Sequence, residues 1–112
     1  MTTQKQVREL VSKAMDINSQ VDAMAIQVCK ELGGDKEVIH FPKNAEPTFV
    51  DGDEYFTIQA IKLNTEYDAF VGEVEIENFL DGTSHIVENL NLALYPINNI
   101  NLLACLALML HD

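Results

Sequence analysis

The stretch "YFTIQAIKLNTEYDAFVGEVEIENF" (Tyr55–Phe79) decides the fold, because it holds two segments in which apolar and polar residues alternate. Alternation with a period of two is typical of a strand that buries one face. The two segments meet at a short polar stretch, Asn64–Tyr67, which indicates a turn between antiparallel strands. We therefore expect the centre of the protein to be a pair of antiparallel strands.

The loop fixes the register that we expect for this pair. If Asn64 pairs with Asp68, one face of the pair is apolar and the other is polar. The expected apolar pairs are Phe56 with Ile76, Ile58 with Val74, and Ala60 with Gly72. The expected polar pairs are Tyr55 with Glu77, Thr57 with Glu75, and Gln59 with Glu73. A slip of one residue would carry the glutamates to the opposite face.

Further strand signals lie on both sides of this pair. The segment "EVIHF" (Glu37–Phe41) is short and β-like, and Asp81–Gly82 is a strong turn signal. The segment "HIVENLNLAL" (His85–Leu94) follows with leucines at alternate positions. The sequence therefore predicts an antiparallel meander of three to four strands.

A long helix is expected at the N-terminus, over Thr2–Leu32, because its apolar residues recur in steps of three and four. Gly33 and Gly34 supply the stop. A helix of this length would span more than about 40 Å, which is longer than the sheet. We therefore expect a homodimer in which a second copy covers the remainder, through an interface formed by Val7, Leu10, Ile17, Val21, Met24 and Val28. The alternative is a helix kinked near Asn18–Ser19 that packs within one subunit.

The C-terminal segment "INLLACLALML" (Ile100–Leu110) predicts a short apolar helix, with Asn98 or Asn99 as its N-cap. A helix that is apolar nearly all round is either central or covered by a partner. The expected architecture is one α+β domain, residues 1–112, with both helices on one face of the sheet.

The net charge of −11 is distributed unevenly along the chain of 112 residues. Residues 1–32 carry equal numbers of acids and bases, whereas residues 65–112 carry eight acids and no base. Because no basic patch exists to bind phosphates, we expect no direct contact with nucleic acid. No segment approaches the roughly 20 apolar residues of a membrane span, so we expect no membrane association. Cys29 and Cys105 fit buried, reduced thiols, which favours a cytoplasmic location.

Three glutamates, Glu73, Glu75 and Glu77, form the candidate site, because they project from one strand face at intervals of about 6.6–6.8 Å. Tyr55 and Gln59 on the neighbouring strand complete the predicted partner-binding set. In one interpretation these carboxylates only block edge pairing and keep the protein soluble. In the other, they bind a basic protein surface.

The sequence indicates no catalytic, cofactor or metal site. In "DGDEY" (Asp51–Tyr55), tyrosine and phenylalanine fall where a calcium loop needs an acid or amide and then a glycine, so an acidic turn is expected. The three histidines have no spacing that connects them to a nucleophile and a carboxylate.

We therefore expect a small, acidic, non-enzymatic interaction protein that binds a basic protein. An inhibitor or nucleic-acid mimic is one concrete form of this expectation. The alternative is a structural assembly subunit, or a small acidic chaperone, that oligomerises through its helices.

Overall fold

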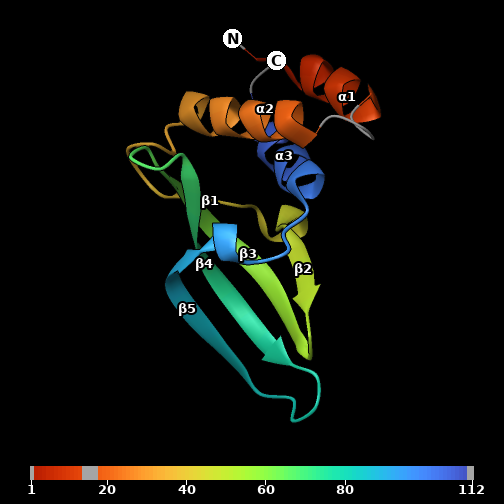
Figure 1. The fold of residues 1–112 in the computed structure, drawn as a ribbon, viewed down its shortest axis with the longest axis vertical. Helices are drawn as coiled ribbons and strands as arrows, with labels where there is room; N and C mark the ends of the chain where they lie inside the picture. The colour runs from red at the N-terminus through yellow and green to blue at the C-terminus, as the bar shows by residue number, and fades with distance from the viewer. Residues whose placement is uncertain (1, 14–17, 111–112) are drawn as a thin grey trace.

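The structure is a computed structural model that describes residues 2–13 and 18–110. Within these residues it shows an α+β fold, so the expected fold class is confirmed (Figure 1). The helices are α1 (Gln4–Lys13), α2 (Asn18–Glu31) and α3 (Asn99–Ala107), with short 3-10 turns η2 (Lys43–Ala45) and η3 (Leu92–Leu94). The strands are β1 (Ile39–His40), β2 (Thr48–Asp51), β3 (Glu54–Asn64), β4 (Ala69–Asn78) and β5 (Ser84–Asn91).

All five strands of the described chain pair antiparallel around β3. One edge of β3 pairs with β1 and with β2 at different points, and the other edge pairs with β4, which pairs with β5. The additional strand is β2, a segment for which no strand was predicted. It joins β3 through the two-residue turn Gly52–Asp53, in which Gly52 has φ +62° as a tight hairpin turn requires.

The N-terminal region forms two helices where one long helix was expected. α1 ends at Lys13 and α2 begins at Asn18, close to the kink considered as the alternative; residues 14–17 lie outside the described part. α1 packs against α3 and α2 and does not extend α2 as one rod (Figure 1). The chain changes direction between α1 and α2 because both helices can then bury apolar side chains in the same core. Gly33, at φ +86°, follows α2 as predicted.

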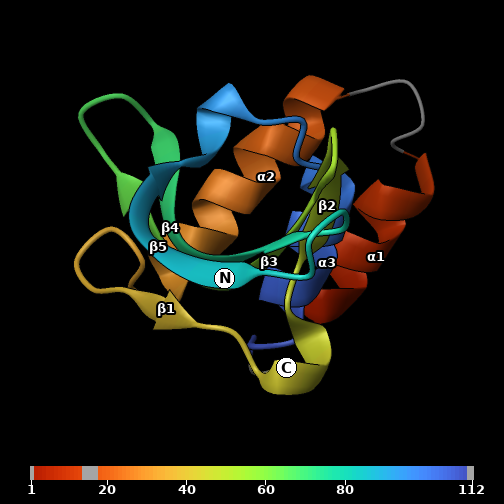
Figure 2. The ribbon, with the colours of Figure 1, turned by 90° about the horizontal axis from the view of Figure 1, so that it is seen from below.

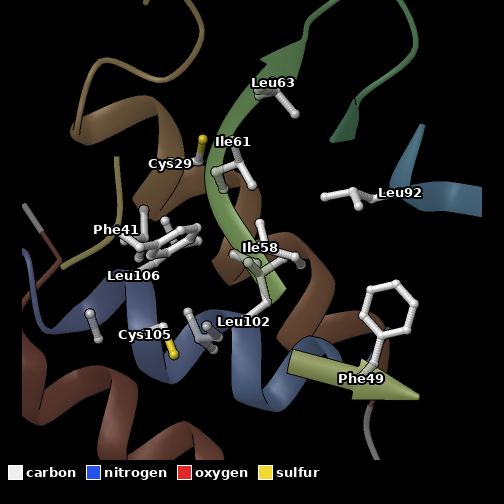
Figure 3. Packing of buried hydrophobic residues seen from close by; sticks show 14 of the residues in the cluster. Cys29, Phe41, Phe49, Ile58, Ile61, Leu63, Leu92, Leu102, Cys105 and Leu106 are labelled. Carbon is white, nitrogen blue, oxygen red and sulfur yellow. The ribbon is translucent and has the colours of Figure 1, made fainter. Parts of the chain in front are cut away.

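α3 lies at the centre of the helical layer, in contact with both α1 and α2. Asn98 is its N-cap, because the Asn98 side chain accepts hydrogen bonds from the backbone N–H groups of Ile100 and Asn101. Figure 3 shows side chains of β3 packed among Cys29 of α2 and Leu102 and Leu106 of α3. α3 is therefore central in the helical layer, which agrees with one of the two alternatives that the sequence left open.

The core continues along β2 and β3 as an aromatic cluster. Phe49 and Phe56 face each other across the two strands and stack with ring centroids 4.5 Å apart. Tyr95, between η3 and α3, contacts both rings at 5.2 Å from Phe56 and 6.0 Å from Phe49. These contacts attach the segment that leads into α3 to the apolar face of the sheet.

Candidate protein-binding face

The register of β3 and β4 agrees with the sequence-based prediction in one half only. Tyr55 pairs with Glu77 and Thr57 with Glu75, as expected. Between Ile58 and Ala60 the register shifts, because the strand bulges there. The predicted pairs of Gln59 with Glu73, Ala60 with Gly72 and Asn64 with Asp68 are therefore wrong. Glu73 pairs with Ala60, and Asn64 pairs with Ala69.

The bulge decides which residues beyond it face the core. Ile61 and Leu63 are buried, whereas Lys62 between them is exposed and pairs with Val71. Since Val71 and Glu73 share a strand face, Lys62 lies diagonally across from Glu73 on that face. In the unshifted register Lys62 would face the core. The candidate face therefore includes one lysine that the sequence-based register had placed elsewhere.

A second irregularity lies on the other side of Glu73. Gly72 pairs with Leu90 but Val74 pairs with Val87, so β5 holds an extra residue in this interval. Asn89, within it, has the left-handed φ of +57°. Bulges increase the local bend and twist of a sheet. The sheet is accordingly curved, with α2 and α3 on its concave side (Figure 2).

The three glutamates lie on the sheet face opposite the core, because Val74 and Ile76 between them are buried. Glu73 and Glu75 are half-buried and Glu77 is exposed. We call this surface the glutamate face. By register it comprises the glutamates and their cross-strand partners Tyr55, Thr57, Ala60, Ser84 and Ile86. It also includes Lys62, which lies diagonal to Glu73, and Val50, which pairs with Tyr55.

Exposed apolar side chains accompany the carboxylates. Ile86 is 54% exposed beside Glu75, and Val50 is 53% exposed beside Tyr55. The ring of Tyr55 contacts that of Phe79, which is 56% exposed, at a centroid distance of 6.2 Å. A face that only kept the protein soluble would not need these side chains. Aromatic and apolar residues among polar ones are typical of a protein-binding surface.

Gln59, the other residue predicted for this set, is half-buried at the bulge itself. The bulge leaves it without a cross-strand partner on β4, so the structure does not bring it opposite Glu73. No residue type in "TIQAIK" (Thr57–Lys62) marks a bulge, so the shift of register could not be predicted from the sequence.

The residues predicted to form an oligomer interface contribute to the core of one subunit. Val7, Val21 and Val28 are buried there, and Leu10 and Met24 pack against it. Ile17 lies outside the described residues. Because these side chains are buried without a second copy, the heptad pattern no longer requires one. The homodimer stays a prediction.

Both cysteines are free thiols in the core, as expected. Burial, followed by the nearby Asp35 carboxylate, raises the pKa of Cys29 to about 11. Burial also raises the pKa of Cys105. Among residues 2–13 and 18–110, no group of three metal-binding side chains comes together. The same residues include no helix of the length and apolarity needed to cross a bilayer.

An apolar groove of about 450 Å³ lies between α1, α3 and η2 and was not predicted. Val7, Val11, Ala104 and Leu108 contribute to its walls. Leu108 is 62% exposed, and Ala104 is also exposed. The exposed side of α3 is thus a second apolar surface, separate from the glutamate face.

Comparison with protein-family models, with curated proteins and with solved structures found no match.

Proposed function

We propose that this protein is a non-enzymatic interaction module that binds a basic protein through the glutamate face. The observation that carries the proposal is the combination of three aligned carboxylates with exposed Val50, Phe79 and Ile86. Carboxylates in a row attract a cationic surface and select for it, and the apolar side chains supply buried area on contact. The two free, buried cysteines support a reducing, cytoplasmic setting.

An inhibitor that mimics nucleic acid is one concrete form of this proposal. Glutamates at alternate positions of a strand repeat every 6.6–6.8 Å, roughly twice the spacing of about 3.4 Å per phosphate along one DNA strand. A basic nucleic-acid channel would accept either row of charges. Lys62 at one end of the row limits the acidic part to Glu73, Glu75 and Glu77.

Affinity capture from a lysate of the native source tests the proposal. The bait is wild type, a triple variant with Glu73→Lys, Glu75→Lys and Glu77→Lys, or a control triple variant with Glu37→Lys, Asp51→Lys and Glu66→Lys. The control changes the net charge equally at exposed positions off the glutamate face. Captures are made at about 0.1 M and about 1 M salt, between which the screening length falls from about 10 Å to about 3 Å.

A partner that the wild type and the control retain at low salt, and that the glutamate variant loses, supports the proposal. Raised salt should release the same partner. A partner that ignores both the salt and the glutamate substitutions would reject this face as the binding site.

The apolar groove favours a second candidate, an assembly subunit or small chaperone that oligomerises through its helices. Ala104→Glu and Leu108→Glu place a charge in this groove at exposed positions, so they test assembly without opening the core. Val21 and Val28 do not serve this purpose, because they are buried within the subunit. Light scattering of the two variants beside the wild type decides: assembly through the groove predicts a smaller mass for the variants.

A further inference from the structure

A cavity of about 420 Å³ lies on the helical side of the sheet, apart from the glutamate face. It is lined by residues of α2, of the turn between β3 and β4, and of the segment from Leu92 to Asn99. Its volume falls within the range of about 300–1,000 Å³ that is usual for small-molecule sites.

The charge of this cavity has one sign. Asp22 reaches it from α2 and Asp68 from the β3–β4 turn, and neither lysine nor arginine is among its described lining residues. Asn99 Nδ2 donates a hydrogen bond to Asp22 Oδ1 over 2.5 Å, which orients that carboxylate. An ionised carboxylate accepts about four hydrogen bonds, so Asp22 keeps capacity for a ligand.

Aromatic rings complement the two carboxylates. Tyr67, Phe70 and Tyr95 line the same cavity together with aliphatic side chains such as Ile26 and Ile97. Tyr67 is 71% exposed, so its ring lies at the rim. The face of an aromatic ring attracts a cation, and aliphatic walls favour an apolar body.

We propose that this cavity binds a small organic cation that carries an ammonium or guanidinium head on an apolar body. The head is held by Asp22 and Asp68 and by the ring of Tyr67, and the body lies against Ile26 and Ile97. An anion of the same shape is repelled by both carboxylates. The proposal is independent of the glutamate face, since that surface is on the other side of the sheet.

Three probes with one phenyl body and different heads test it: phenethylamine as the cation, phenethyl alcohol as the neutral form, and phenylpropionate as the anion. Binding is followed by calorimetry and by the amide shifts of ¹⁵N-labelled protein. The expected result is that only phenethylamine binds, with shift changes at residues 22–26, 67–70 and 92–99.

Matched variants separate this site from the general attraction of an acidic protein for cations. Asp22→Asn and Asp68→Asn should each weaken phenethylamine at least about threefold. Asparagine tolerates the left-handed φ of +49° at position 68, so the backbone of the turn is kept. Glu66→Gln makes the same charge change in the same turn outside the cavity and should leave the affinity unchanged.

Equal binding of the three probes would overturn the proposal, because the cavity would then be selective only for the apolar body. Equal weakening by Glu66→Gln, or shift changes away from the cavity, would also overturn it. Absence of phenethylamine binding to the wild type would do so directly, whether or not each variant folds.

Discussion

Ala60 on β3 pairs with Glu73 on β4, and the shift of register that precedes this pair places Lys62 on the glutamate face. A single bulge at Gln59 thus sets two things at once. It turns Ile61 and Leu63 into the core, and it places a lysine diagonally across from the first of three glutamates. The composition of the candidate binding face therefore follows from an irregularity in one strand.

The bulge predicts that substitutions at two adjacent residues, Ile61 and Lys62, differ strongly in their effect on stability. Ile61→Ala should lower the free energy of unfolding by about 2–5 kcal/mol, because it leaves a cavity in the core. Lys62→Ala should change it by no more than about 0.5 kcal/mol, because this side chain is exposed. Urea unfolding of the two variants beside the wild type measures both values. If Lys62→Ala proved as costly as Ile61→Ala, the shifted register would be incorrect.

The N-cap of α3 formed by Asn98 is expected to contribute measurably to the stability of the protein. Asn98→Ala removes the acceptor for two backbone N–H groups at the start of α3 and should cost about 1 kcal/mol of stability. Asn98→Asp should keep most of the wild-type value, since aspartate caps equally well. Asn44→Ala, at an exposed position, is the control. Thermal or urea unfolding measures the series, and equal losses for the alanine and aspartate variants would contradict the capping role.

The raised pKa of Cys29 predicts a loss of stability at alkaline pH. Its pKa is about 11 in the folded protein against an ordinary value of 9.0. Between these values the unfolded chain releases the thiol proton more readily, so this contribution is complete below pH 9.0 and is lost as the pH rises toward 11. At the upper end the loss should be roughly 1–2 kcal/mol.

Cys29→Ala should lower stability at neutral pH yet lose less of it on going to alkaline pH than the wild type does. Urea unfolding of both proteins at pH 8 and pH 10.5 gives this difference of differences, in which the titration of tyrosines and lysines cancels. Parallel losses in the two proteins would show that Cys29 titrates normally in the fold.

Local signals in the sequence predicted those parts of the fold that depend on neighbouring residues. Asn98 marks a helix start, Gly33 marks a helix stop, and the alternation over Phe56–Ile58 and Val74–Ile76 gives the register of that half of the hairpin. Each depends on backbone chemistry or on a period that a few residues reveal.

The parts that were missed depend on contacts between distant residues. The bulge at Gln59 belongs to the pairing of β3 with β4, and no residue type near Gln59 indicates it in the sequence. Leu92 and Leu94 continue the alternation of β5, but the chain turns as η3, burying Leu92 against Gly72 and leaving Leu94 exposed. The heptad pattern predicts one helix, whereas its described apolar residues pack in the core from two separate helices, α1 and α2.

Site-specific photo-cross-linking tests the central claim, that the glutamate face is where a partner binds. A photoreactive amino acid is placed singly at Ile86 beside Glu75, at Leu108 beside the helical groove, or at Leu94; all three side chains are exposed. After irradiation in a native lysate, we predict a cross-linked partner from position 86 only, with its yield falling at raised salt. A partner cross-linked from Leu108 and not from Ile86 would contradict the claim and favour the helical groove.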